Sequence, residues 1–436
     1  MVEKRLRKFI LPSILATVGS SCYTLADVLF ISMAAGENGI AAVNLITPIF
    51  ALIYAISSMA GIGAASRYSI QKYRQQPCDD YFSNAVFSTL LICVPFLLVG
   101  LFCPDMLLKL LGADATIVGL GTTYLRIVLC FTPFFMLNTI LVSFVRNDGA
   151  PQLAMCATLV SCLFNVVFDY ILMFPLNLGL TGAALATGCS PIISMGICLI
   201  HLLSKKNTIK FTWKTPSIKR FISSCKLGVA AFVDQISGGV TTLILNFILL
   251  GLAGNTAVAA YGVISNVALV GSSMLNGVSQ GLQPMSSEAT GKADEDAKKR
   301  IIKHSLLIGM IITVILLAVI WAFAEPIVSV FNSDHSAELA SLASSGLKLY
   351  FIGFLFAAVN IIRAGYFSAT DKSLQSTIIA VFRGVVAIVA FAFILSKLFG
   401  ITGAWLAFTA SELFTLILSL VCERWLKNNE IKENAA

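Results

Sequence analysis

Long apolar stretches, each about the length of a membrane-spanning helix, recur along the whole chain. Runs such as "AVFSTLLICVPFLLVGLF" and "SLLIGMIITVILLAVIWAFA" combine Leu, Ile, Val, Phe and Ala with scattered Gly, and they lack the alternation typical of a barrel strand. About 20 such residues cross a bilayer as a helix. The pattern therefore predicts an all-α integral membrane protein.

Breaks in this hydropathy pattern predict twelve transmembrane helices, which places both termini on the same side of the membrane. The first predicted helix follows "MVEKRLRKF" and is too long for the apolar core of a signal peptide, so we expect it to be retained. The predicted ranges are 9–33, 43–66, 82–103, 119–143, 152–174, 181–203, 228–251, 257–283, 305–324, 345–367, 374–396 and 402–422.

Composition agrees with this class. Of the 436 residues, 57% are apolar and only 12% are charged, and the mean hydropathy is +0.88. Soluble domains carry about 25% charged residues. The eleven cysteines include no C-x-x-C pair and the three histidines are far apart, so we expect neither a structural metal nor a bound cofactor.

The basic residues are distributed unevenly across the predicted membrane. With the N-terminus inside, 24 of the 30 Lys and Arg fall in inner loops and tails, and the segment 204–226 carries seven of them with no acid. This is the positive-inside pattern, which predicts that both termini are cytoplasmic. The net charge of +8 therefore indicates membrane orientation, and we expect no nucleic-acid partner.

Three phrases recur in the same order and at nearly the same spacing. "GLTGAALA" (179–186) returns as "GITGAWLA" (400–407), "GIAAVNLI" (39–46) as "AVAAYGVI" (257–264), and "NTILVSFVRNDGAPQ" (138–152) as "NIIRAGYFSATDKSL" (360–374). The repeats predict two six-helix lobes related by a pseudo-two-fold axis along the membrane normal. We divide the chain into an N-lobe (1–204), a basic cytoplasmic linker (205–226), a C-lobe (227–423) and a cytoplasmic tail (424–436).

Two such lobes enclose a cleft that rocking can open to either side, which is the architecture of a transporter. The sequence contains no G-x-x-x-x-G-K-[ST] motif and no soluble domain large enough to bind nucleotide. It also lacks H-E-x-x-H and clustered histidines, which disfavours a membrane enzyme. A secondary transporter driven by an ion gradient remains.

Acidic residues inside the predicted spans are the candidate ion site, because burying a charge in the bilayer costs several kcal/mol. Asp27 lies on the first helix, and Asp169 lies on the fifth with Asn165 on the same face, four residues earlier. A carboxyl group in an apolar medium binds a proton more readily than in water, and the same oxygens with the Asn165 amide suit Na⁺. The alternative is a structural hydrogen bond. The second lobe has Asn246 and Ala390 at the equivalent positions, so we expect the ion site in the N-lobe only.

Two further acids are weaker candidates. Asp234 is expected near the cytoplasmic start of the seventh helix, where it would meet Lys226 or reach the interface, whereas Glu412 lies nearer the middle of the twelfth. Three arginines fall within spans as candidate counter-ions or cleft residues: Arg126, Arg363 and Arg383. Pro12 in the first helix favours a kink that would link Asp27 to movement of the helix, or it makes a harmless bend.

Several of these stretches together are similar to one known family. "ADVLFISMAAGENGIAAVNLITPIF", the N-x-x-x-D pattern followed by "GLTGAALATG", and "LAGNTAVAAYGVISN" resemble the MATE (multidrug and toxic compound extrusion) family, and within it the DinF/MepA-like prokaryotic branch. The resemblance implies efflux of amphipathic, often cationic compounds in exchange for H⁺ or Na⁺ by alternating access. It implies a cation site at Asp27, Asn165 and Asp169, with Thr187 as a nearby hydroxyl, and a role for Pro12.

The same resemblance implies a monomer in the prokaryotic cytoplasmic (inner) membrane, whose partners are small-molecule substrates and the lipid bilayer. The acid that some relatives carry in the middle of the seventh helix has no match here. The rival function is a flippase for lipids or lipid-linked oligosaccharides, since the wider superfamily shares this architecture. Such a carrier would have a more cationic cavity. Arg126, Arg363 and Arg383 leave this alternative function open.

Overall fold

The computed structural model of the chain describes residues 2–332 and 336–435, and all regular structure in these residues is helical. The first half of the chain forms α1 (Val2–Tyr73), α2 (Asp80–Phe102), α3 (Pro104–Leu110), α4 (Ala115–Cys130), α5 (Thr132–Asn147), α6 (Pro151–Met173) and α7 (Gly179–Leu202). The second half forms α8 (Ile218–Gly291), α9 (Glu295–Phe331), α10 (Ala337–Ile352), α11 (Phe354–Ala369), α12 (Ser373–Val381), the π-helical turn η1 (Phe382–Val386) and α13 (Ala387–Ala435).

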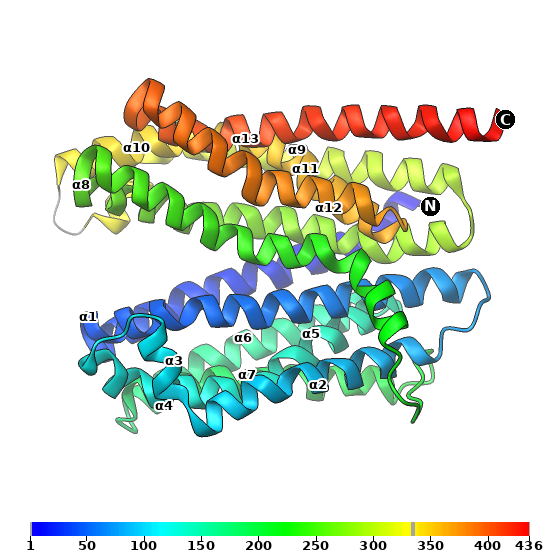
Figure 1. Cartoon of the computed structure of the whole chain (residues 1–436), viewed down its shortest axis with the longest axis horizontal. Helices are drawn as coiled ribbons and strands as arrows, with labels where there is room; N and C mark the ends of the chain where they lie inside the picture. The colour runs from blue at the N-terminus through cyan, green and yellow to red at the C-terminus, as the bar shows by residue number, and fades with distance from the viewer. Residues whose placement is uncertain (1, 333–335, 436) are drawn as a thin grey trace.

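The helices of the two halves form two groups that lie side by side (Figure 1). Apolar core clusters are mostly confined to one group: Ile46 and Phe135 belong to a cluster of the first half, and Trp405 to one of the second. One cluster crosses the seam, because Leu6 at the start of α1 packs with Leu282 of α8. The first stretch of α1 therefore contributes to the contact between the two groups.

Eight helices among the described residues are long and apolar enough to cross a membrane, or up to ten if each of two bent pairs is one span. The bent pairs correct the predicted helices 119–143 and 345–367. Each is two short helices meeting at 45°: α4 with α5, and α10 with α11. The hydropathy pattern missed these bends because each apolar stretch continues beyond its bend, although Pro133 and Gly353 stand at the two breaks.

Glycines with left-handed backbone angles mark the turns of the repeat. Gly36 and Gly254, 218 residues apart, have φ values of 59° and 66° and interrupt α1 and α8. Gly179 and Gly400, 221 residues apart, have φ values of 51° and 59°. Only glycine adopts such angles without strain. The repeated phrases of the sequence therefore correspond to repeated backbone turns.

The helix α8 begins at Ile218, inside the predicted linker segment 205–226. Its start has a local cause: the Ser217 side chain accepts a hydrogen bond from the backbone N–H of Arg220, which is an N-cap. As a result, Asp234 lies sixteen residues after the first residue of α8 and well inside the helix. The expectation that Asp234 sits near a helix start was wrong.

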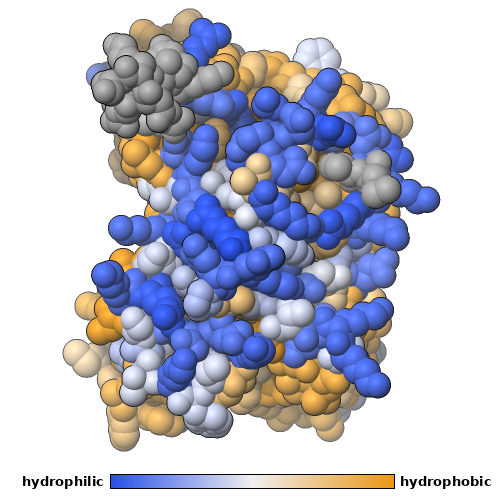
Figure 2. Space-filling model, turned by 90° about the vertical axis from the view of Figure 1, so that its right-hand side faces the viewer, coloured by the Kyte–Doolittle hydropathy of each residue, from blue (hydrophilic) through white to orange (hydrophobic). Residues whose placement is uncertain are grey.

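One end of the molecule is polar. Both termini lie at this end (Figure 1), and Figure 2 shows hydrophilic side chains gathered across it between apolar flanks. Two ion pairs join the halves here: Arg67 of α1 to Asp371 at 2.8 Å and Arg5 of α1 to Glu288 of α8 at 2.6 Å.

Glycines bring the two halves into backbone contact near the same end. A Cβ atom added at Gly228 of α8 would overlap the carbonyl oxygen of Met59 of α1, and one added at Gly63 would overlap that of Ser224. Because the obstacle is backbone, no side-chain rotation relieves it.

Gly228→Ala is therefore expected to destabilise the folded protein by about 1–3 kcal/mol, the usual cost of overpacking. The melting temperature of the purified protein in detergent measures this. Gly196→Ala is the matched control, because a Cβ at Gly196 meets nothing within 4 Å. Equal melting temperatures for the two variants would contradict the close contact.

Candidate functional site

The four predicted N-lobe residues meet at one place, between α1, α6 and α7. Asp27 comes from α1, Asn165 and Asp169 from successive turns of α6, and Thr187 from α7. Asp169 is 0% exposed, Asn165 1% and Thr187 8%. The spacing of Asn165 and Asp169 places both side chains on one face of α6, which is the face turned inward.

Hydrogen bonds connect these side chains. In the amide orientation that satisfies both ends, the nitrogen of Asn165 donates to Oδ2 of Asp169 at 3.0 Å and its oxygen accepts from the backbone N–H of Thr187 at 3.2 Å. The carboxyl groups of Asp27 and Asp169 lie within hydrogen-bond reach of each other. Two ionised carboxylates close to each other repel, and a proton or a cation held between them would relieve that repulsion.

Two carboxyl oxygens of Asp27 and Asp169 lack a hydrogen-bond partner in the described part of the chain. Oδ1 of Asp27 and Oδ1 of Asp169 are buried and have no hydrogen-bond partner among the described residues. Buried polar atoms are nearly always satisfied, so such atoms call for an explanation. Two carboxylate oxygens and an amide can hold a proton or a dehydrated Na⁺.

A cavity of about 420 Å³, here called cavity 1, lies next to this site. Its wall is built from α1, α5, α6, α7 and α8, so both halves contribute. Asn165 belongs to its wall, whereas Asp27 and Asp169 do not. Asn165 therefore connects the carboxyl pair to the cavity. Arg146 is the one charged residue among the wall residues described.

Pro12 also lines cavity 1. The backbone of α1 stays helical there, and Gly36 is its one non-helical position among the described residues. A link between Pro12 and movement of α1 remains a prediction.

The three span arginines have different surroundings. Arg126 is exposed, and Arg363 pairs with Glu423 and lies 5.3 Å from the ring centre of Phe367. Neither lines cavity 1 or the smaller cavity described below. Arg383 is the counter-ion of two acids.

Arg383 binds Asp234 and Glu412 at the same time. Its Nη1 lies 2.9 Å from Oδ1 of Asp234 and its Nε 2.9 Å from Oε1 of Glu412. The expected partner of Asp234, Lys226, is not its partner, because Asp234 lies deeper in α8 than predicted. The sequence singled out all three residues, with Arg383 as a candidate counter-ion, but it did not indicate that they meet, because Asp234 lies 149 residues from Arg383.

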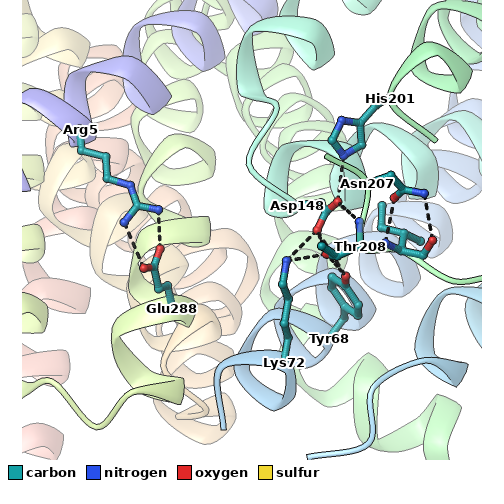
Figure 3. Close-up of polar contacts among 9 residues, drawn as sticks. Arg5, Tyr68, Lys72, Asp148, His201, Asn207, Thr208 and Glu288 are labelled. Carbon is teal, nitrogen blue, oxygen red and sulfur yellow. Dashed lines mark hydrogen bonds and ion pairs between the residues drawn. The ribbon is translucent and has the colours of Figure 1, made fainter. Parts of the chain in front are cut away.

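A second polar centre that the sequence did not reveal surrounds Asp148, between α5 and α6 (Figure 3). Its carboxylate, 0% exposed, accepts from Lys72 at 2.8 Å and contacts His201 at 2.9 Å. It also accepts from the backbone N–H of Thr208 at 2.9 Å, which fastens the linker to the first half. Burial raises the pKa of Asp148, but the hydrogen bonds from Lys72, Thr208 and His201 outweigh it and hold that pKa below its ordinary value.

Comparison with known proteins adds sequence and fold relatives. The MatE family model matches residues 12–171 and 231–394. The chain is 28% identical to the multidrug export protein MepA of Staphylococcus saprophyticus over 429 residues, which cover 96% of this chain and 93% of the relative. It is 28% identical to the MepA protein of Staphylococcus aureus strain MRSA252 over 428 residues, with the same coverage.

Solved structures share the fold. The chain is similar to the outward-facing conformation of a multidrug resistance MATE family transporter of the MOP superfamily, with a TM-score of 0.91, 21% identity and coverage of 99% of this chain and 97% of the other. It is also similar to a MOP superfamily transporter from Pyrococcus furiosus whose reversed binding-pocket polarity suggests a different function, with a TM-score of 0.89, 22% identity and coverage of 97% and 95%.

The Asp148 centre yields a stability prediction. Asp148→Asn is expected to lower the free energy of unfolding by about 1–3 kcal/mol, because the charged hydrogen bonds to Lys72 and His201 are lost. Since the folded-state pKa of Asp148 is lowered, its contribution is present above about pH 4 and disappears as the pH falls through that lowered value.

The measurement is the melting temperature at pH 7.5. Asp79→Asn serves as control, because Asp79 and its partner Lys210 are 49% and 68% exposed and such pairs contribute little. A wild-type melting temperature for Asp148→Asn would refute the prediction.

Proposed function

We infer the function of this chain from the family to which it belongs, the MATE family of multidrug export transporters. It is a multi-pass membrane transporter, related to bacterial MepA, and not an enzyme. We propose that it exports amphipathic, often cationic compounds in exchange for H⁺ or Na⁺. The observation that carries the coupling is the pair of buried carboxyl groups, Asp27 and Asp169, with one unpartnered oxygen each.

We propose twelve spans in two lobes. At 1.5 Å per residue the 74 residues of α8 would extend about 110 Å, far beyond a hydrocarbon core of about 30 Å. The break at Gly254 divides α8 into two spans, and the break at Gly400 divides the stretch Ser373–Val421 in the same way. With each bent pair as one span, this gives six spans on either side of the linker, and 1–204, 205–226, 227–423 and 424–436 as the units of the chain.

The polar end is proposed to face the cytoplasm, with both termini, in a prokaryotic inner membrane. The excess of Lys and Arg in its loops supports this orientation. The ion pairs Arg67–Asp371 and Arg5–Glu288 join the halves at this end, so they must part when the cavity opens inward. Both halves of one chain form the wall of cavity 1, so a monomer contains the complete cavity.

Export follows from competition between occupancy of the carboxyl pair by the coupling ion and occupancy of cavity 1 by the substrate. A proton or Na⁺ bound at Asp27 and Asp169 reduces the negative charge of the site by one, and Asn165 transmits the change to the wall of cavity 1. One-for-one exchange of H⁺ for a monovalent organic cation moves no net charge, so a pH difference alone drives it, at about 1.4 kcal/mol or tenfold per unit. A neutral substrate gains a further ~2.3 kcal/mol per 100 mV of membrane potential.

The second candidate function, a lipid or lipid-linked oligosaccharide flippase, rests on Arg146. This residue is 7% exposed, lines cavity 1 and forms no ion pair with a described carboxylate. Its Nη1 instead binds the Gln280 side chain at 2.5 Å. An unpaired guanidinium fits a phosphate, which is the head group that such a carrier would bind.

The test is efflux of a fluorescent organic cation from proteoliposomes under a pH gradient and a Na⁺ gradient imposed separately. We expect wild-type export to respond to at least one gradient, and Asp27→Asn and Asp169→Asn to abolish that response while the protein stays folded. Asp105→Asn, on the exposed face of α3, is the matched control.

Gradient-driven export by both site variants at the wild-type rate would exclude the carboxyl pair as the coupling site. A wild-type protein that responds to neither gradient would favour the flippase.

A further inference from the structure

The ion-pair cluster of the second half, Asp234–Arg383–Glu412, belongs to no part of the proposed coupling site. Arg383 stands in the π-helical turn η1, where one extra residue widens the helix. Gly384 lets this turn approach α8, since a Cβ there would come within 2.7 Å of the Ser237 side chain. The turn and the glycine together bring the guanidinium to Asp234, 149 residues away in sequence.

The two carboxylates of this cluster are held differently. Glu412 is 1% exposed, and Asn360 donates to its Oε2 at 2.8 Å while Arg383 donates to its Oε1 at 2.9 Å. Asp234 has a side chain that is 31% exposed. Its Oδ1 accepts from Arg383 and its Oδ2 from Asn276 at 3.2 Å. Glu412 is therefore the permanent partner of Arg383, and Asp234 is the carboxylate that a ligand can reach.

Asp234 and Arg383 line a cavity of about 120 Å³, here called cavity 2. It adjoins cavity 1, because the walls of both include Ser58, Gln235, Asn276 and Gln280. Cavity 2 is thus a small polar side pocket of the larger space.

A further acceptor in cavity 2 has nothing to bind. Gln283 lines this cavity and is 4% exposed, and its Oε1 has no hydrogen-bond partner among the described residues. The cluster itself holds two carboxylates and one guanidinium, so it carries a formal charge of −1 when all three are ionised. The nearest further cation on these walls, Arg146, lies beyond Gln280 in cavity 1. The net negative charge of the cluster and the unpartnered Oε1 of Gln283 both favour a positively charged ligand.

We propose that cavity 2 binds the cationic head group of a substrate, a protonated amine, guanidinium or quaternary ammonium, with Asp234 as its counter-charge, while the apolar body of the substrate lies in cavity 1. The proposal rests on the export function proposed above. Arg383 acts as a tethered competitor: it neutralises Asp234 when the pocket has no substrate and stays bound to Glu412 when a substrate arrives. Because Arg383 stays paired with Glu412, its buried guanidinium is not left without a partner, which would cost free energy.

The test uses purified wild-type protein and two dansyl amides that differ only in the head group. One ends in trimethylammonium and the other in its neutral isostere, tert-butyl. We expect wild type to bind the cationic probe more tightly, and Asp234→Asn to weaken that binding by about tenfold or more with the neutral probe unchanged. Fluorescence titration measures both dissociation constants.

Three further variants separate recognition from folding. Asp234→Glu keeps the charge and is expected to retain the preference for the cation. Glu412→Gln leaves Arg383 with Asp234 as its one carboxylate partner and is expected to weaken cation binding as well. Asp296→Asn, at the exposed start of α9, is the matched control and is expected to bind as wild type.

An unchanged ratio of the two dissociation constants in Asp234→Asn would overturn the proposal, and so would an equal loss of both probes. These results are independent of export. Cation binding that depends on Asp234, without gradient-driven efflux by the wild type, would support the pocket and refute the export function. Gradient-driven efflux together with cation binding that does not depend on Asp234 would support the export function and refute the pocket.

Discussion

A charge in the interior of a bilayer must have a partner, and this constraint determines where the polar chemistry of the chain lies. Asp27 and Asp169 interact with each other, and Arg383 is shared between Asp234 and Glu412. Each cluster draws its members from different helices, so each depends on the helices packing in one arrangement. Because pairing compensates most of the desolvation cost, a change of one partner, such as a proton or a bound cation, changes which arrangement is favoured.

The spacing of Asn165 and Asp169 predicts that these two side chains share one face of a helix, whereas Asp27 was a candidate as another acid within a span and Thr187 only through the family resemblance. The second cluster was not predictable in this way. It depends on the π-helical turn at Phe382–Val386 and on the start of α8 at Ile218, and neither leaves a mark in hydropathy. The bends that separate α4 from α5 and α10 from α11 were missed for the same reason, since apolar residues continue through them. Ser217 at the start of α8 and Pro133 and Gly353 at the two bends are local signals of these features, but hydropathy does not register them.

The repeat of the chain is most visible in its backbone. Gly36 pairs with Gly254 and Gly179 with Gly400 as turns of similar geometry, and the family model matches one stretch in each half. Side chains diverge where the backbone does not: the carboxyl pair of the first half has no counterpart at Asn246 and Ala390, whereas the second half has an arginine between two acids. The two halves thus share the geometry of their backbone turns but differ in their buried charged side chains.

The carboxyl pair does not line cavity 1 but interacts with Asn165 of its wall, and most of that wall consists of Ser, Thr, Asn and Gln side chains. In the proposed function, the residues that would meet a substrate are thus largely separate from those that would hold the coupling ion. Under antibiotic selection, substitutions on the wall can change which compounds are accepted without altering the energy source. An exporter built in this way can broaden its spectrum in single mutational steps.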